Sequence, residues 1–219
     1  MFFNWNKPLT KNNISSNTNI ITYKESNNSE IIQTKIIIFV PYCEVYKPYI
    51  IECLESIENQ IYSNYHIILI NDGSSNIDFL NEYIKNKSYY TFLSFENNYG
   101  PAHSKWRFIE YLQNNKEKFN MNDIVTIMDG DDKYTTEKAL SIINDTFGKT
   151  KCWVSFGEMS GIYSLNHIQK LKYVNFNAIR KNEFCFNHPR SMKLELLLYL
   201  NKEEFKFQDK WLQKCTDVA

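Results

Sequence analysis

The chain has 219 residues, of which 43% are hydrophobic and 23% are charged, so it has enough apolar side chains to bury a sizeable core. This composition excludes a wholly disordered protein. The 25 Lys and Arg residues equal the 25 Asp and Glu residues in number, so the formal net charge is zero. Nucleic-acid-binding proteins owe their affinity for phosphate to a basic excess that this chain lacks, and we expect no nucleic-acid partner.

The apolar runs and the cysteines indicate the compartment. No run comes near the roughly 18 apolar residues needed to cross a bilayer, and the N-terminus lacks the basic-then-apolar pattern of a signal peptide. The five cysteines are an odd number without a close pair, which favours reduced thiols over disulfides or a zinc site. We therefore expect a cytoplasmic protein with no transmembrane segment.

Strand and helix patterns begin after a polar N-terminal segment. Residues 1–34, rich in Asn, Ser, Thr and Lys, are expected to form a loosely ordered extension to a domain at 35–219. Short apolar runs predict buried strands at 36–40, 66–70, 89–95, 124–128 and 152–156, with Pro41 ending the first. Apolar stripes at helical spacing predict helices near 50–61, 77–84, 101–112 and 139–147. This alternation predicts an α/β fold with an open, mostly parallel sheet flanked by helices.

The alternation of predicted strands and helices is less regular beyond Gly157. The apolar spacing predicts two further helices, at Met192–Leu200 and Glu203–Cys215. The chain ends at Ala219 close behind the second of these patterns, so we expect it to be a fragment of a longer protein.

Acidic side chains follow three of the predicted strands. Glu44 follows the first strand, Asp72 the second, and the Asp-Gly-Asp-Asp segment at 129–132 the fourth. Ligands of open parallel sheets bind outside the carboxyl ends of the strands, so these side chains should share one rim. Like charges there would raise one another's pKa values unless a cation compensated them, and carboxylates suit Mg²⁺ or Mn²⁺ completed by phosphate oxygens. The sequence therefore predicts a divalent metal ion and a diphosphate-bearing substrate.

The same segments, in the same order, resemble a known family. The stretch KIIIFVPYCEVYKPYIIECLESIENQIYSNYHIILINDGSSN at 35–76 is similar to the opening of a family 2 glycosyltransferase of the GT-A fold. The resemblance continues through NNYGPAHSKW at 97–106 and IVTIMDGDD at 124–132, the family's metal motif. It implies a Rossmann-like GT-A domain with a nucleotide-sugar-binding half at 35–157 and an acceptor-side half at 158–219. The sequence departs from the family at Asn71, often Asp, at Cys43, and at Trp106, usually Asn.

The resemblance also implies individual roles. Asp72 would accept a hydrogen bond from uracil, because an ionised carboxylate can only accept. Lys105 stands where the family has Arg and would meet the base or the diphosphate. Asp129 and Asp131 would hold Mn²⁺ or Mg²⁺, with Asp129 facing the ribose or the water shell of the metal. The residues expected at the nucleotide sugar, a UDP-sugar donor, are Pro41, Tyr42, Glu44, Asp72, Lys105, Asp129, Gly130 and Asp131.

An inverting sugar transfer needs one base that removes the proton from the acceptor hydroxyl. The resemblance offers Asp217, and His188 and Arg190 are candidates to close over the diphosphate, or in the case of His188 to approach the metal. The sequence leaves open whether the acceptor is a glycan, a protein or a small molecule. Each residue also has an ordinary interpretation: an acidic turn at 129–132, a core aromatic at Tyr42, and surface side chains at the others.

The sequence is also compatible with two alternative functions. A sugar-nucleotide nucleotidyltransferase shares the sheet type, but the first strand is followed by Pro41 and Tyr42 and not by a Gly-rich triphosphate loop. A catalytically inactive nucleotide-sugar-binding module would keep the same motifs without turnover.

Overall fold

The computed structural model describes residues 33–157 and 187–213. Within them, one sheet has the strand order β3-β2-β1-β4-β6-β5. Its strands are β1 (Ile36–Tyr42), β2 (Tyr65–Asp72), β3 (Tyr90–Phe95), β4 (Ile124–Ile127), β5 (Val154–Gly157) and β6 (Asn187–Lys193). β1 pairs in parallel with β2 and β4, β2 pairs in parallel with β3, and β6 runs antiparallel to both β4 and β5. The expected open, mostly parallel α/β sheet is confirmed.

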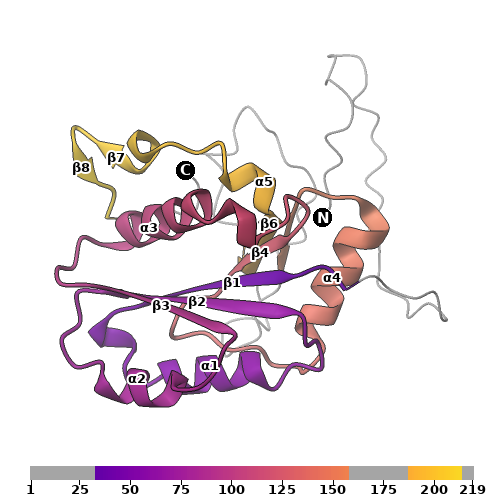
Figure 1. Cartoon of the computed structure of the whole chain (residues 1–219), viewed down its shortest axis with the longest axis horizontal. Coiled ribbons are helices and arrows are strands. Elements are labelled where there is room, and N and C mark those ends of the chain that lie inside the picture. The colour runs from indigo at the N-terminus through magenta and orange to yellow at the C-terminus, as the bar shows by residue number, and fades with distance from the viewer. Residues whose placement is uncertain (1–32, 158–186, 214–219) are drawn as a thin grey trace, which may run out of the picture.

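Helices cover both faces of this sheet (Figure 1). Helices α1, α2 and α4 pack on one face, whereas α3, α5 and the 3₁₀ helix η5 pack on the other. Their bounds are α1 (Ile50–Glu58), α2 (Asp78–Ile84), α3 (Pro101–Asn114), α4 (Ala139–Thr150), α5 (Leu194–Leu197) and η5 (Lys202–Phe205). Two further 3₁₀ turns are η1 (Glu44–Tyr46) and η2 (Lys116–Lys118). The arrangement has three layers, helix, sheet and helix, around two apolar interfaces.

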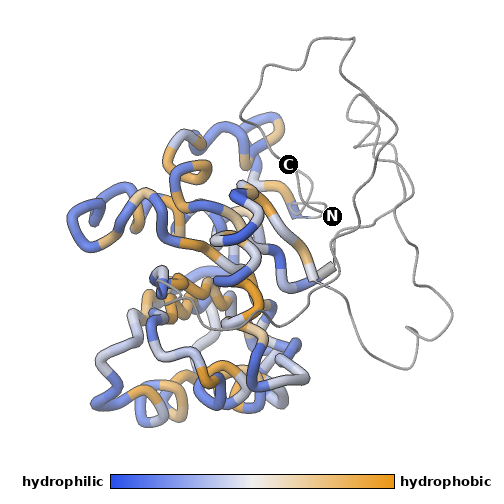
Figure 2. Tube along the Cα trace, turned by 90° about the vertical axis from the view of Figure 1, so that its right-hand side faces the viewer, coloured by the Kyte–Doolittle hydropathy of each residue, from blue (hydrophilic) through white to orange (hydrophobic). Residues whose placement is uncertain are grey.

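The central strand β1 explains why both faces are covered. Every residue from Ile36 to Val40 is 0% exposed. Successive strand side chains point to opposite faces, so Ile36 and Ile38 pack with the α1 layer while Ile37 and Phe39 pack with the α3 layer. Figure 2 shows hydrophobic positions concentrated in the interior of the described part and hydrophilic positions at its outer turns.

Pro41 does not end the first strand, so that prediction was wrong. β1 continues to Tyr42, and Pro41 lies opposite Ile70 of β2. On its other side, the pairing of β1 with β4 ends where Phe39 meets Ile127. A proline is tolerated at this point because β1 is paired on one side only, as in an edge strand.

The two helices predicted near the C-terminus are mostly wrong. Met192 belongs to β6, and only the single turn α5 is helical in the first segment. The second segment forms η5 followed by an antiparallel hairpin of β7 (Lys206–Phe207) and β8 (Lys210–Trp211). Gln208 and Asp209 form the turn with φ angles of 50° and 61°, the left-handed conformation of a tight hairpin. Neither residue is glycine, so the sequence carries little signal for this turn.

The described helices include none that is both long enough and apolar enough to cross a membrane. The expected N-terminal extension falls almost wholly on residues 1–32, which lie outside the described residues.

Candidate functional site

Two chain segments meet at the carboxyl end of the central strand β4. The segment after β4 carries Asp129, Gly130, Asp131 and Asp132, and the start of β6 adds His188. β6 contributes because it runs antiparallel to β4, which brings its first residues beside the end of β4. The acidic segment predicted after the fourth strand therefore lies at this end of the sheet, and a histidine from a distant part of the chain joins it.

Asp129, Asp132 and His188 form a cluster that suits a metal ion. One ligand atom from each lies within 4.8 Å of those of the other two. His188 Nε2 is 3.4 Å from Asp129 Oδ2, and the other ring nitrogen, Nδ1, is 3.3 Å from the carbonyl oxygen of Ile127. A proton on Nδ1 would satisfy that carbonyl and leave Nε2 as a lone-pair donor, the usual arrangement of a metal-bound histidine. Two carboxylates and one imidazole fit Mn²⁺ or a similar divalent ion.

The cluster differs from the metal pair that the sequence predicts. Asp129 is in it, but its partners are Asp132 and His188, and Asp131 is not a member of the group. The Asp131 side chain is exposed and follows Gly130 around the turn. His188 was considered for the metal from the sequence, whereas Asp132 was noted only as part of the motif.

Negative charge at this turn is not fully compensated by the described residues. Burial raises the pKa of the Asp132 carboxyl, and the nearby carboxylates of Asp129 and Asp131 raise it further, against the lowering effect of His188 and Arg190. Although Asp131 is exposed to solvent, its carboxyl group is partly desolvated by neighbouring atoms, which raises its pKa, and Asp129 adds to the rise. A bound cation would oppose both shifts, because its positive charge favours the ionised carboxylates.

Gly130 allows the turn to approach β1. A Cβ atom at this position would lie 2.8 Å from the carbonyl oxygen of Pro41, 3.0 Å from a ring carbon of Tyr46 and 3.2 Å from Ile50 Cδ1. The structure therefore gives Gly130 a packing role, and leaves its predicted contact with the nucleotide sugar as a prediction.

Asp72 lies at the end of β2 and is bound to the protein itself. Its Oδ2 accepts a hydrogen bond from the Gly100 amide at 2.9 Å, and Oδ1 accepts one from the Tyr99 amide at 3.2 Å. His103 Nδ1 is 3.4 Å from Oδ1, and the Asp72 residue is only 6% exposed. Asp72 thus joins the end of β2 to the N-terminus of α3.

The turn around Asp72 is held by its neighbours. Asn71 donates to the Ser74 carbonyl at 2.8 Å and to Ser94 Oγ at 2.9 Å, and its own Oδ1 accepts from the Ser74 amide at 3.0 Å. An amide can both donate and accept, which an Asp at this position could not do when ionised. The departure from the family at Asn71 therefore has a local structural reason.

The other predicted site residues have varied surroundings. Tyr42 is 0% exposed, and its ring lies in the core against the Phe79 ring, with centroids 6.2 Å apart. Glu44 is exposed and 3.5 Å from Lys47 Nζ. Lys105 is half-buried on α3. Asp217 lies outside the described residues.

His103 is a residue that the sequence interpretation missed. Its ring makes edge contacts with the rings of Phe95, Tyr99 and Trp211, with centroids 5.3, 4.9 and 5.0 Å away. It thereby connects Asp72 with the C-terminal hairpin. The one sequence signal for it is its place in the first turn of the helix that begins at Pro101, where a side chain can reach back over the preceding loop.

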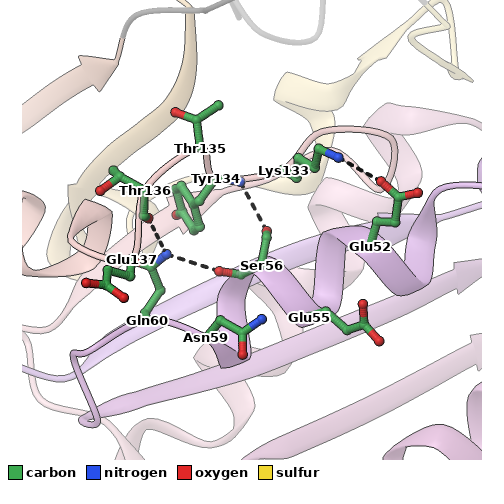
Figure 3. A pocket seen from close by; sticks show the side chains of 10 residues that line it. All are labelled: Glu52, Glu55, Ser56, Asn59, Gln60, Lys133, Tyr134, Thr135, Thr136 and Glu137. Atoms are coloured by element: carbon green, nitrogen blue, oxygen red, sulfur yellow. Dashed lines mark hydrogen bonds and ion pairs between the residues drawn. The ribbon is translucent and has the colours of Figure 1, made fainter.

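A pocket of about 400 Å³ opens beside the metal-suited cluster. Asp132 and His188 belong to its lining, together with apolar side chains of α4 such as Ile142 and Ile143. A second, more open pocket lies between α1 and residues 133–137 (Figure 3).

Comparison with known families places this architecture. The sequence model described as glycosyl transferase family 2 matches residues 37–192. The chain belongs to glycosyl transferase family 2. The matched range runs from Ile37 of β1 to Met192 of β6, and it includes the cluster of Asp129, Asp132 and His188. No curated protein sequence matches this family 2 chain.

The family 2 chain also resembles solved structures. S. aureus TarS 1–349 in complex with UDP-GlcNAc is 18% identical with a TM-score of 0.57, over 74% of this chain and 46% of that chain. The same TarS fragment in complex with UDP is 18% identical with a TM-score of 0.60, over 80% of this chain and 52% of that chain. The chain thus spans about half of the TarS fragment. The likeness shows the fold, which is of the GT-A type.

Trp106 explains a further departure from the family motif. It is 8% exposed on α3, and its ring lies 6.1 Å from that of Phe205 in η5. In this family 2 chain the Trp106 side chain is therefore part of the core, where it packs against the C-terminal segment.

Proposed function

We propose that this domain belongs to a metal-dependent, inverting glycosyltransferase that transfers a sugar from a UDP-sugar to an acceptor hydroxyl. The observation that carries the proposal is the cluster of Asp129, Asp132 and His188 at the ligand-binding rim of a family 2 sheet. The description of TarS as a complex with UDP-GlcNAc supports the choice of donor.

The metal would be held by Asp129, Asp132 and His188, with Asp131 beside it. When bound, a divalent ion supplies positive charge that stabilises the departing diphosphate. The ion would also compensate the carboxylates that raise the pKa values of Asp131 and Asp132. Mn²⁺ and Mg²⁺ both accept carboxylate oxygens, and the imidazole favours Mn²⁺.

The nucleoside would lie against the ends of β1 and β2. Asp72 accepts two backbone hydrogen bonds, and two carboxylate oxygens offer about four acceptor positions, so it retains capacity for the uracil imide. Pro41 is half-buried at the end of β1 and would contribute backbone contacts, with Glu44 at the outer edge. Lys105 would approach the diphosphate as a point charge.

Asp217 is the proposed general base that removes the proton from the acceptor hydroxyl as it attacks the anomeric carbon. Asp217→Asn should lower turnover by on the order of 10² to 10⁴, the usual contribution of a positioned base, and leave UDP affinity nearly unchanged. A cytoplasmic location and the absence of a nucleic-acid partner are part of the same proposal.

The decisive experiment is a calorimetric titration of UDP into the protein with Mn²⁺, with Mg²⁺ and with EDTA. We expect binding with either metal and a loss of at least tenfold in affinity with EDTA, because the ion would connect the carboxylates to the diphosphate. GDP serves as the control for the base. Equal UDP affinity with and without metal would contradict the metal-dependent mechanism, and equal affinity for GDP would contradict the choice of donor.

A further inference from the structure

Hydrogen bonds from one face of α1 hold the segment that carries the acidic cluster. We call Cys53, Ser56 and Gln60 the α1 ladder, and residues 129–140 the carboxylate loop. The ladder residues are three and four positions apart, so they lie on one side of the helix and its C-terminal end. Figure 3 shows the side chains of Ser56 and Gln60 directed at the loop, with dashed lines marking their hydrogen bonds to it.

The first contact is at the candidate ligand Asp129. Cys53 Sγ lies 3.6 Å from the Asp129 carbonyl oxygen, which also accepts the Asp132 amide at 3.0 Å. This second bond closes the turn that sets the spacing of the two carboxylates. The buried Cys53 thiol therefore supports the backbone atom on which that turn depends.

The second contact is in the middle of the loop. Ser56 Oγ accepts the Tyr134 amide at 3.1 Å and donates to the Cys53 carbonyl at 2.7 Å. The Ser56 hydroxyl group thus connects the carboxylate loop to the backbone of Cys53. Its removal would leave the Tyr134 amide without this acceptor, two residues from Asp132.

The third contact is at the end of the loop. Gln60 Nε2 donates to the Thr136 carbonyl at 2.7 Å and to the Ser56 carbonyl at 3.0 Å, while Oε1 accepts the Leu140 amide at 3.1 Å. Gln60 is 8% exposed, so these bonds are shielded from water. The neighbouring Ile61 amide adds a bond to the Glu137 carbonyl at 2.9 Å.

We propose that the α1 ladder positions the carboxylate loop for metal binding, so that Cys53, Ser56 and Gln60 set the metal affinity without contacting the ion. The inference rests on the proposed metal site. Most of the loop up to α4 has no regular secondary structure, so its shape depends on bonds from outside it. Groups that orient the ligands of a metal from behind typically change its affinity by about 10- to 100-fold.

Ser56 gives the sharpest test because small substitutions separate its hydroxyl from its size. Ser56→Ala should weaken Mn²⁺ binding by about tenfold or more, measured by EPR titration of free Mn²⁺. Ser56→Thr keeps a hydroxyl that can bond to the preceding helical turn, and should restore affinity to within about threefold of wild type. Asn59→Ala is the matched control, because Asn59 lines the same pocket and forms no side-chain hydrogen bond with the described loop residues.

A second measurement needs no metal. NMR-detected hydrogen exchange of the metal-free protein should show faster exchange at the Tyr134 amide in Ser56→Ala, with unchanged protection in β1 and β2. Gln60→Glu should do the same at the Leu140 end of the loop, because it places a carboxylate oxygen against two carbonyl oxygens.

The outcomes separate this inference from the proposed function. If wild type binds Mn²⁺ and Ser56→Ala binds it within threefold as tightly, the ladder does not position the site and only this inference fails. If wild type binds no Mn²⁺, the metal site itself is wrong and both fail. A loss of affinity in Ser56→Ala that Ser56→Thr does not restore would also overturn the positioning role.

Discussion

The carboxylates at the ends of β2 and β4 occupy equivalent positions in the sheet but have different partners. Asp72 is 6% exposed and accepts the amides of Tyr99 and Gly100, with His103 beside it. The Asp129 side chain is 36% exposed and lies beside the His188 ring, while Asp131 and Asp132 add negative charge nearby. Hydrogen bonds within the protein compensate the negative charge of Asp72, whereas a bound cation would compensate the charge of the carboxylates at the end of β4.

This difference indicates a structural role for Asp72 and a ligand-binding role for the carboxylates at the end of β4. A carboxylate that accepts two backbone amides stabilises the fold whatever the ligand does. Like charges close together, as at Asp131 and Asp132, lower the stability of the metal-free protein, and a bound cation would relieve this repulsion. Substitutions at the two positions should therefore have opposite signatures in stability and in metal binding.

The largest effect is expected at the β4 end. Asp129→Asn removes one of three candidate ligands, and Mn²⁺ affinity should fall by about 100-fold or more. This loss exceeds the roughly 10- to 100-fold effect of residues that only position the ligands. The free energy of unfolding of the metal-free protein should not decrease, because a like charge has been removed. EPR titration and urea denaturation of the same preparation measure both. Retained Mn²⁺ affinity, within threefold, would remove Asp129 from the site.

Asp72→Asn should give the reverse pattern. An amide in place of the carboxylate presents an N–H group to one of the two backbone donors, so the free energy of unfolding should fall by about 1–3 kcal/mol. Mn²⁺ affinity should stay within threefold of wild type. If this variant is as stable as wild type but loses Mn²⁺ binding, the division of roles between the two carboxylates is wrong.

Gly130 tests how closely the carboxylate loop must approach β1. Gly130→Ala should lower the free energy of unfolding by about 1–3 kcal/mol, because the added methyl group meets Pro41, Tyr46 and Ile50. Gly148→Ala is the control, since nothing lies within 4 Å of a Cβ there and alanine favours the α4 helix by up to about 1 kcal/mol. Thermal unfolding of both variants gives the comparison. A Gly130→Ala protein as stable as Gly148→Ala would show that the loop can move away.

The sequence was sufficient for the parts of the fold that depend on local pattern. The run Ile36–Val40 predicted a strand buried on both faces because every one of its residues is apolar, and the motif after β4 predicted the acidic rim. The GT-A fold and family followed from these motifs and their order.

The sequence was insufficient where distant segments decide the outcome. His188 reaches Asp129 only because β6 inserts between β4 and β5, a pairing between segments that lie far apart in the chain. The motif left Tyr42 open to a place at the nucleotide or in the core, and only the structure shows that the strand continues past Pro41 and that the Tyr42 ring packs against Phe79. Asp72 is occupied by amides of a loop that precedes α3, which no spacing within the motif reveals.

The smallest expected effect concerns pH and the raised pKa of Asp132. Because the folded state holds this proton more tightly than the unfolded state, the contribution to stability is present below the ordinary aspartate pKa of 3.8 and is lost as pH rises through the raised value. Asp132→Asn cannot titrate, so its free energy of unfolding minus that of wild type should increase over this window, by less than about 1 kcal/mol because the group is partly exposed. Urea denaturation of both metal-free proteins from about pH 3.5 upward, in steps of about half a unit, measures this difference, and the titration of distant groups, which is common to both proteins, cancels from it. Saturating Mn²⁺ should reverse the slope for wild type, since metal ligands must be deprotonated to bind. A difference that stays constant with pH would mean that the carboxylates at the end of β4 do not oppose one another, and the contrast with Asp72 would then rest on exposure alone.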